Sequence, residues 1–246
     1  MDPNFWCRPS SLQYPLVWSE FNKTDKNGVV LEFQIEDLPE HLFPKCLEFM
    51  VKYFIPDEPF FTCLGFANDS TSVKDLVNCW EEVLSDKCTL ICTLKNPKSS
   101  ETDIVGIYIL YYHHKIHDSH DHRYNGMQFR ALCKVATYIE EQSDRYQKFR
   151  IDDYLDEFGL CVHSKYRGLG IATELLKTRI KLGAAVGLKY SFTLCTAIAS
   201  QKASERAGYK NLFELDYKTL EEIFPDLKLN VENTPTVRYM YVEHNC

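Results

Sequence analysis

The segment VHSKYRGLGIATELLK, Val162 to Lys177, places two glycines and an arginine where an apolar strand meets an amphipathic helix. Gly168 and Gly170 allow the main chain to approach a ligand without a side chain in the way. The first turn of such a helix presents unpaired N–H groups that carry a partial positive charge. The turn therefore suits a phosphate group, and Arg167 could reach a second one. A tight strand-to-helix turn that binds nothing could use the same residues, so the turn alone does not identify a ligand.

Two common nucleotide-binding motifs do not fit this turn. A P-loop ends in GK[ST] and needs an earlier glycine, but GLGIATE supplies neither the lysine nor that glycine. A dinucleotide fingerprint needs a third glycine three positions after the second, where Thr173 stands. These departures argue against ATP, GTP and NAD as ligands.

A second candidate for chemistry is Glu58, which lies in FIPDEPFF between Asp57 and Pro59 and close to the aromatic pair Phe60 and Phe61. An apolar environment raises the pKa of a carboxyl group above its reference value of about 4.3. Such a group can accept and release protons near neutral pH. A glutamate in a loop is, taken alone, more often a solvated acid.

The composition favours one large globular domain over the whole chain, residues 1–246. The chain is 45% hydrophobic and 26% charged, which is enough to build a sizeable core. Its net charge of −7 argues against a nucleic-acid partner, because phosphate recognition normally concentrates Lys and Arg. No basic lead precedes an apolar run, and no stretch approaches the roughly 18 apolar residues of a membrane span. We expect a soluble, cytoplasmic protein without a membrane partner.

Ten cysteines are scattered through apolar segments, and none forms a CxxC pair. Cys88 and Cys92 come nearest. On a strand they would lie about 13 Å apart at roughly 3.3 Å per residue, which is too far for a disulfide. We expect free, mostly buried thiols in a reducing compartment.

Hydrophobic periodicity predicts an α/β chain. Apolar runs predict strands at 28–37, 88–95, 103–114, 156–162, 189–197, 211–217 and 236–244. Helical spacing predicts helices at 38–54, 72–85, 127–146, 170–187 and 200–209. Pro44 should kink or restart the first helix, and Ser70 or Ser72 should cap the second. The second half of the chain contains a strand-helix-strand-helix run, as α/β proteins do.

The segment RGLGIA, Arg167 to Ala172, matches the [RQ]-x-x-G-x-[GA] motif, and the chain resembles the GCN5-related N-acetyltransferase (GNAT) superfamily. More narrowly, it resembles the insect-type arylalkylamine N-acetyltransferases. In that group YRGLGIA is followed by a segment similar to LCTAIASQKASERAGY and preceded by a DEP tripeptide, seen here in FIPDEPF. The three motifs stand in the expected order over about residues 29–244, and the similarity is strongest from Phe158 to Tyr209.

The resemblance implies a GNAT fold, with a central, twisted, mostly antiparallel sheet of about seven strands that is flanked by helices. The sheet should be splayed between its two central parallel strands, with acetyl-CoA in the split between FGLCV and KYSFTLC. In this superfamily the loop and helix start hold the pyrophosphate of coenzyme A, and the preceding strand pairs with the pantetheine arm. The implied cofactor-binding residues are Leu160, Cys161, Val162, Arg167, Gly168, Leu169, Gly170, Ile171 and Ala172.

The resemblance assigns the role of general base to Glu58, acting directly or through water. A primary amine with a pKa near 10 is protonated at neutral pH, and only about one molecule in a thousand is nucleophilic, so a proton has to be removed. Main-chain N–H groups at the end of the FGLCV strand could stabilise the oxyanion. Ser200 is the first choice to assist the leaving sulfur, with Thr196 and Tyr209 as rivals. Ser200 could instead cap its helix, Thr196 could only pack, and Tyr209 could belong to the core.

No metal is expected, because thioester aminolysis needs none. The run YYHHKIHDSHDH lacks cysteines and a helical i, i+4 pair, so we expect a polar loop after a strand rather than a zinc site. Its histidines are His113, His114, His117, His120 and His122. The vertebrate melatonin-pathway acetyltransferases carry a catalytic histidine pair where this chain has Asp156 and Phe158, which disfavours a histidine relay.

We expect direct acetyl transfer, within a ternary complex, to the primary amine of a small arylalkylamine such as dopamine, tyramine, octopamine or serotonin. We expect the enzyme to be a monomer or weak dimer. A polyamine or agmatine acetyltransferase would share every motif, and a protein N-acetyltransferase would need an open peptide groove. A catalytically silent CoA-binding module would keep Arg167 to Ala172 without a usable Glu58. Three departures from the family border the amine site and leave the substrate open. They are a longer helical segment before Asp57 that contains Pro44, Thr196 in place of a common serine, and the long connection at 216–235.

Overall fold

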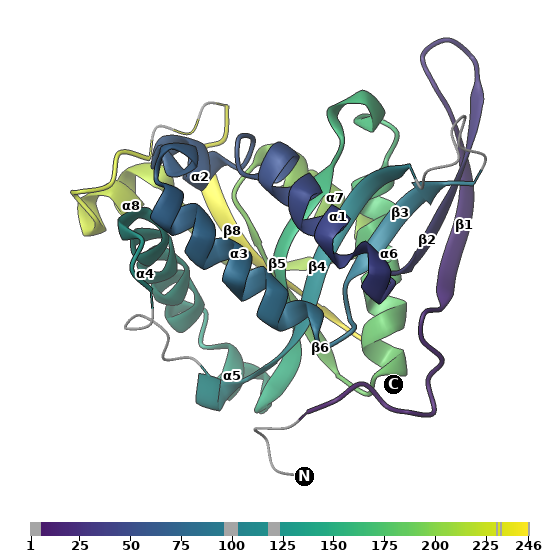
Figure 1. Cartoon of the computed structure of the whole chain (residues 1–246). Coiled ribbons are helices and arrows are strands. Elements are labelled where there is room, and N and C mark those ends of the chain that lie inside the picture. The colour runs from purple at the N-terminus through teal and green to yellow at the C-terminus, as the bar shows by residue number, and fades with distance from the viewer. Residues whose placement is uncertain (1–5, 96–102, 118–123, 230, 232, 246) are drawn as a thin grey trace.

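The computed structural model of the chain describes residues 6–95, 103–117, 124–229, 231 and 233–245. Eight strands form one sheet in the order β1-β2-β3-β4-β5-β6-β8-β7 (Figure 1). The strands are β1 Val17–Thr24, β2 Val30–Asp37, β3 Leu90–Leu94, β4 Ile104–His114, β5 Asp153–Val162, β6 Tyr190–Cys195, β7 Lys210–Asp216 and β8 Thr236–Glu243. Neighbouring strands are antiparallel except β5 and β6, which are parallel. The predicted mixed, mostly antiparallel sheet is confirmed.

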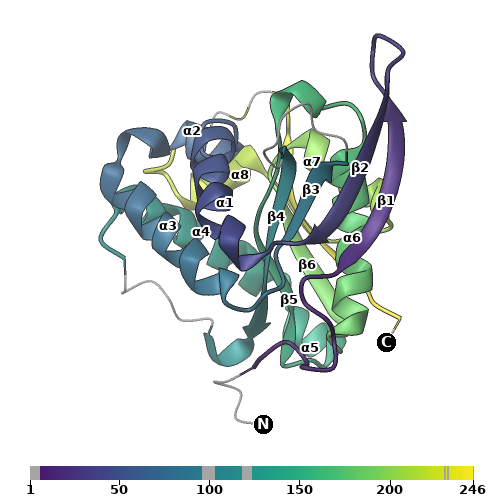
Figure 2. The same ribbon diagram turned by 45° about the vertical axis from the view of Figure 1, so that its right-hand side comes forward.

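Helices cover both faces of this sheet (Figure 1 and Figure 2). They are α1 Phe43–Phe49, α2 Pro59–Cys63, α3 Ser70–Leu84, α4 Met127–Gln142, α5 Arg145–Phe149, α6 Ile171–Ala185, α7 Ile198–Ala207 and α8 Tyr217–Ile223. Residues of α1, α3 and α4 pack in one core cluster, and residues of α6 and α7 pack in another. The buried strand β4 separates the clusters: Ile107 and Ile109 face the first, whereas Tyr108 and Leu110 face the second.

The segment before Glu58 is a series of short helical turns. A 3₁₀ turn, η2 Glu40–Leu42, leads into α1, and Pro44 lies in the first turn of α1, where a missing N–H is tolerated. The predicted restart at Pro44 is confirmed. α1 continues as a π-helix, η3 Met50–Phe54, a rare conformation that is frequent at functional sites. The other short turns are η4 Phe66–Asn68, η5 Lys115–His117 and η6 Ser164–Tyr166.

The sheet opens between its two parallel strands. Within the described residues β5 and β6 share one registered pair, Leu155 with Ser191, beyond which the strands diverge. Arg179 of α6 donates to the carbonyl oxygens of Leu155 (2.6 Å) and Phe192 (2.7 Å) and so joins both strands where their ladder ends. The predicted splay between these strands is confirmed.

A carboxylate replaces the main-chain ladder on the open side of this pair. Glu157 Oε1 accepts hydrogen bonds from the hydroxyl of Thr193 (2.7 Å) and from the N–H of Leu194 (3.3 Å). Burial raises the pKa of Glu157, while the nearby Arg179 guanidinium lowers it. Side chains rather than main-chain groups therefore hold the two strands together at the split.

Three elements are not predicted by the sequence pattern: β1, α2 and α8. Within the described residues the sheet has eight strands, one more than expected, and the additional strand is β1. β1 pairs on one side only, with β2, and alternates polar residues with partly buried ones, as an edge strand can. The connection at 216–235 contains the additional helix α8.

Two helix boundaries also differ. Asp69, rather than Ser70 or Ser72, caps α3, since its side chain accepts from the N–H groups of Thr71 (3.1 Å) and Ser72 (3.2 Å). The predicted helix at 127–146 is interrupted after α4 by Asp144, whose φ of 49° lies in the left-handed region and ends the helical path.

Candidate active site

Glu58 stands at the N-cap of α2, shortly after the π-helical turn η3. Its Oε2 accepts a hydrogen bond from the N–H of Phe61 (2.8 Å), one of the donors that a helix start leaves unpaired. Pro59 occupies the start of the helix, a position that proline favours. The DEP tripeptide thus folds into a helix cap that fixes the carboxylate of Glu58.

The pKa of Glu58 is raised to about 7, chiefly because burial disfavours the charged carboxylate. Hydrogen bonds from the side chain of Thr196 and from the N–H groups of Phe61 and Phe60 favour the charged form and offset part of this effect. Phe60 and Phe61 are both buried, as the neighbouring aromatic pair suggested. A carboxyl group with this pKa is able to take up and release a proton at neutral pH.

Thr196 and Tyr217 complete the surroundings of Glu58. Thr196 directly follows β6, so its side chain reaches Glu58 from the strand that borders the split. Its carbonyl oxygen accepts a hydrogen bond from the hydroxyl of Tyr217 (2.6 Å), and the ring of Tyr217 packs edge-on against Phe60 at 5.9 Å between centroids. The sequence pointed to Thr196 but not to Tyr217. The long connection at 216–235 indicates the region to which Tyr217 belongs, but it does not single out this residue.

Ser200 and Tyr209 are used in other ways. The Ser200 hydroxyl donates to the carbonyl oxygen of Ala197 (2.8 Å) and accepts from its N–H (3.3 Å), which closes the first turn of α7. Tyr209 is 4% exposed and packs in the core cluster of α6 and α7. Burial raises its pKa, and its charged neighbours are Arg179 and Glu157. The structure therefore brings Thr196, but not Tyr209, to Glu58, and Ser200 acts as a cap.

The glycine turn leaves room for a ligand at its main chain. Gly168 and Gly170 have φ values of +81° and +78°, in the left-handed region that favours glycine. Apart from Gly168 itself and its two chain neighbours, no heavy atom of the described residues lies within 4 Å of the position that a Cβ on Gly168 would take. Ile171, the first residue of α6, is buried, and Leu169 packs partly against the same cluster, so their side chains anchor the turn while its main chain is exposed. This cradle fits a phosphate group.

Arg167 connects the glycine turn to the loop that carries Glu58. Its guanidinium makes two contacts with the carboxylate of Asp57, at 3.0 Å and 2.9 Å, and its Nε donates to the carbonyl oxygen of Val162 at 3.1 Å. Asp57 is therefore held in an ion pair next to the candidate base Glu58. The ion pair places the candidate phosphate site beside the candidate base.

A bulge in β5 shapes the wall between these two sites. Phe158 and Gly159 together face one residue of β4 where the register shifts, and the N–H of the Trp80 indole donates to the Phe158 carbonyl at 2.9 Å. Gly159 has a φ of +124°, and a Cβ there would come within 2.9 Å of Phe54 and 3.0 Å of Met50. Only glycine lets η3 pack this closely against β5.

Beyond the bulge, alternate residues of β5 face the split. The N–H of His163 donates to Val105 of β4 (2.9 Å), so by strand alternation the main chain of Cys161 also faces β4. The main-chain groups of Leu160 and Val162 then point away from β4, toward the open side. Of the three residues expected to bind the pantetheine arm, these two offer main-chain groups to the split.

The positions of a histidine pair in the vertebrate enzymes hold a different arrangement here. Asp156 is buried and accepts from the hydroxyl of Tyr111 (3.0 Å), and its carboxylate lies 3.8 Å from His113 Nδ1. His113 and His114 are the last two residues of β4, in agreement with the strand predicted at 103–114. His120 and His122 lie outside the described residues.

The acetyltransferase (GNAT) family model matches residues 139–209. The crystal structure of a yellow fever mosquito (Aedes aegypti) protein assigned as arylalkylamine N-acetyltransferase 7 matches with a TM-score of 0.88 and 32% sequence identity, over 97% of this chain and 99% of that chain. The chain belongs to the GNAT acetyltransferase family. It is accordingly an acyltransferase, and family membership implies acetyl-CoA as its cosubstrate.

Further acetyltransferases share this GNAT fold at lower identity. Arylalkylamine N-acetyltransferase 2 from Aedes aegypti has a TM-score of 0.74 and 16% identity, over 87% of this chain and 99% of that chain. A polyamine N-acetyltransferase from Drosophila melanogaster that forms N-acetylagmatine has a TM-score of 0.68 and 15% identity, over 86% and 99%. At these identities the likeness concerns the fold.

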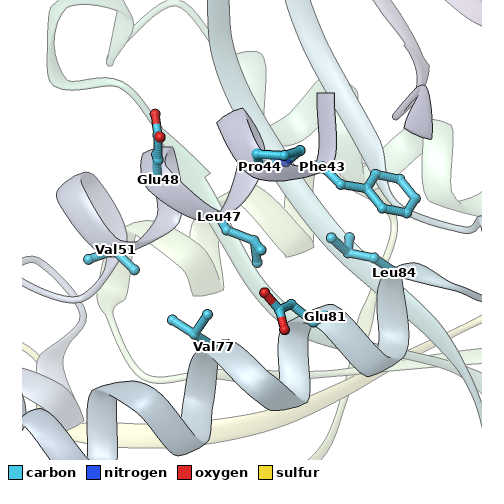
Figure 3. Close-up of a pocket in the computed structure, with 8 residues that line it drawn as sticks. All are labelled: Phe43, Pro44, Leu47, Glu48, Val51, Val77, Glu81 and Leu84. Atoms are coloured by element: carbon cyan, nitrogen blue, oxygen red, sulfur yellow. The ribbon is translucent and has the colours of Figure 1, made fainter. Parts of the chain in front are cut away.

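A cavity of ≈ 670 Å³ in this GNAT domain lies between α1 and α3, apart from the groups described above. Figure 3 shows its mainly apolar lining, to which two glutamates contribute. The lining residues are Phe43, Pro44, Leu47, Glu48, Val51, Val77, Glu81 and Leu84. Glu58, Thr196 and the glycine turn do not line it, so we do not place the transfer chemistry there.

Three remaining features concern metal, membrane and cysteines. In the part of the chain that the structure describes, no cluster of three or more His, Cys, Asp or Glu side chains is arranged to hold a metal ion. Among those residues no helix is both long and apolar enough to span a membrane. Every described cysteine of this GNAT protein is free and most are buried, in agreement with the expectation from the sequence.

Proposed function

We propose that this GNAT protein transfers the acetyl group of acetyl-CoA to the primary amine of a small arylalkylamine of the dopamine, tyramine, octopamine or serotonin type. One observation carries the proposal: Glu58, with a pKa raised to about 7, is held by a helix cap and by Thr196 at the end of β6. A base with this pKa, beside the split of the sheet, is what the acetylation of a protonated amine requires.

We assign the phosphates of acetyl-CoA to the glycine turn and its pantetheine arm to the open edge of β5. The room above Gly168 and Gly170 and the main-chain groups of Leu160 and Val162 support this assignment. Acetyl-CoA would supply the thioester carbonyl that the amine attacks. An N–H group of the open β5 edge is then suited to stabilise the negative charge that develops on the carbonyl oxygen.

In the proposed mechanism Glu58 takes the proton that the ammonium group must lose before its nitrogen becomes nucleophilic. Thr196 holds the carboxylate in place, and Tyr217 in turn holds the main chain of Thr196. The departing sulfur needs a proton or a hydrogen bond. We assign this role to Thr196, whose hydroxyl is hydrogen-bonded to Glu58, whereas Ser200 would first have to release the Ala197 carbonyl. Tyr209 would have to leave the core.

The surroundings of Glu58 favour an aromatic amine over a polyamine. Phe60 and Tyr217 provide aromatic rings next to the carboxylate. A polyamine or agmatine carries a second cationic group and would need a second free carboxylate nearby. Asp57, the adjacent candidate, is already paired with Arg167. The 32% identity to a mosquito protein assigned as an arylalkylamine N-acetyltransferase points the same way.

A panel of amines tests the proposal. We expect the release of CoA from acetyl-CoA to be fastest, by kcat/KM, with dopamine, tyramine, octopamine or serotonin. A higher kcat/KM with spermidine or agmatine would reverse the substrate assignment. Acetyl-CoA binding without turnover of any of these amines would identify a silent CoA-binding module instead.

We also propose that residues 1–246 act as one acetyltransferase domain, in the cytoplasm, as a monomer or weak dimer. The single sheet supports the first point, since it includes strands from Val17–Thr24 at one end of the chain to Thr236–Glu243 at the other. The free, buried thiols suit a reducing compartment. Sedimentation velocity over a range of protein concentrations would measure the oligomeric state.

A further inference from the structure

The hairpin of β1 and β2 brings a lysine to the glycine turn. In β1 exposed residues alternate with partly buried ones, and Phe21 and Lys23 share the partly buried face. This hairpin lies next to α6, the helix that begins at the turn (Figure 2). Lys23 Nζ lies 3.9 Å from the position that a Cβ on Gly170 would take. Its ammonium group therefore stands beside the main chain that we assign to the phosphates.

Packing holds the Lys23 side chain in this place. Its Nζ lies 5.6 Å from the centre of the Phe21 ring, and Phe21 stacks on the fully buried Phe33 at 5.3 Å. The side chain of Lys23 is 33% exposed, so a ligand at the turn can still reach the ammonium group. The lysine is thus positioned by the core of the hairpin rather than free in solvent.

Lys23 can change partner at low cost. Its Nζ lies 3.5 Å from Oε1 of Glu174, in the first turn of α6. The same oxygen also pairs with Lys177 at 3.4 Å. Because Lys177 would continue to neutralise Glu174, Lys23 can move to a phosphate without leaving the carboxylate unpaired.

Arg167, the cationic residue of the motif, already has other partners. Arg167 makes a two-contact ion pair with Asp57 and also donates to the main chain of Val162. A phosphate at the turn would meet the N–H groups of the helix start, and it would need a further positive charge. Lys23 supplies that charge from a different part of the chain.

We propose that Lys23 is a further coenzyme A-binding residue whose ammonium group pairs with a phosphate of acetyl-CoA at the glycine turn. This inference rests on the proposed placement of the cosubstrate. Lys23 acts on binding alone, and it takes no part in the proton transfer at Glu58. The pyrophosphate and the 3′-phosphate of CoA share the chemistry that would recognise it, and a ligand that lacks the 3′-phosphate distinguishes them.

Calorimetry of CoA binding tests this role without relying on activity. Lys23→Met keeps an unbranched side chain beside Phe21 but removes the charge. Lys177→Met is the control: it removes an equal charge that pairs with the same residue, Glu174, but Lys177 lies two helical turns from Gly170. We expect Lys23→Met to weaken CoA binding about fivefold, since one ion pair replaces another, and Lys177→Met to change it less than twofold. Lys23→Arg should keep the affinity of the wild type.

Titration with dephospho-CoA identifies the phosphate. If Lys23→Met weakens CoA and dephospho-CoA equally, the lysine binds the pyrophosphate. If it weakens CoA alone, the lysine binds the 3′-phosphate, and either result supports the proposal. Equal affinities of wild type and Lys23→Met for CoA would overturn it, as would equal losses in the two methionine variants. Should Lys23→Met not fold, Lys23→Gln serves in its place. A wild-type protein that binds no CoA would instead reject the placement of the cosubstrate.

Discussion

Burial in the fold brings the pKa of the Glu58 carboxyl group close to neutral pH. Because its pKa is about 7, the fraction of Glu58 in the charged form that can accept a proton increases as the pH rises through neutrality. We expect kcat/KM for an arylalkylamine to rise with pH through this value. Glu58→Gln should lower kcat/KM about a hundredfold or more and remove this dependence, because the amide has no basicity. Affinity for acetyl-CoA, measured by calorimetry, should stay the same. A variant with near-normal kcat/KM and the same pH profile would place the base elsewhere.

The hydroxyl of Thr196 should influence the pH at which kcat/KM rises. Its hydrogen bond favours the charged form of Glu58 and so lowers the pKa. Thr196→Val removes the hydroxyl at similar volume, and the rise of kcat/KM should then move to higher pH. Thr196→Ser keeps the hydroxyl and should leave the profile in place. Identical pH profiles for the valine and serine variants would show that the hydroxyl does not act on Glu58.

Single residues also mark how far the sequence could be interpreted. Glu58 and the glycines could be found because local patterns contain them: a DEP tripeptide beside an aromatic pair, and a glycine-rich turn between a strand and a helix. Tyr217 and Lys23 could not, because their roles come from contacts between segments far apart in the chain. Ser200 shows the converse, since a residue in a family motif is used here as a helix cap.

At the scale of elements, the two ends of α6 offer a matched comparison. Gly170 at its start and Gly187 just after its end have φ values of +78° and +79°. Valine at either position should cost about 1 to 2 kcal/mol of stability through backbone strain. Gly170→Val should also weaken acetyl-CoA binding at least about tenfold, because its side chain fills the room at the turn. Calorimetry measures the change in acetyl-CoA affinity, and thermal melting measures the change in stability. Equal affinity in both variants would reject the phosphate site.

Elements with a strong apolar pattern could be predicted, and elements defined by their neighbours could not. β4 was identified from its continuous apolar run, which is buried on both faces. β1 was missed because its polar residues form a strand only through pairing with β2. The parallel pair and its split followed from the family resemblance. The hydrogen bonds that Arg179 and Glu157 make across that split could not be predicted from a local sequence pattern, since they join a helix and two strands that are far apart in the sequence.

At the scale of the whole molecule, the proposed base Glu58 should reduce stability. Glu58 has a folded-state pKa of about 7 against an ordinary value of 4.5, so the native state holds its proton more tightly than the unfolded state. The resulting loss of stability is absent at a pH below the ordinary pKa of 4.5. It increases with pH until the pH exceeds the folded-state pKa. Glu58→Gln should therefore raise the free energy of unfolding by about 1 to 3 kcal/mol at pH 8 and little at pH 4.

Chemical denaturation at the two pH values measures this difference. Glu222→Gln, which removes a carboxylate at an exposed position, is the control and should change stability by no more than about 0.5 kcal/mol at either pH. A loss of stability for Glu58→Gln at pH 8 would show that the charged carboxylate supports the fold.

The open seam between β5 and β6 also divides the sheet into two hydrogen-bonded blocks, one of five strands from β1 to β5 and one of β6, β8 and β7. Strands that share almost no ladder can open independently, as separate cooperative unfolding units. Native-state hydrogen exchange should therefore give the amides of β6 and β8 a common opening free energy that differs from that of β3 and β4. A ligand lodged in the seam would contact both blocks, and saturation with acetyl-CoA should draw the two opening free energies together.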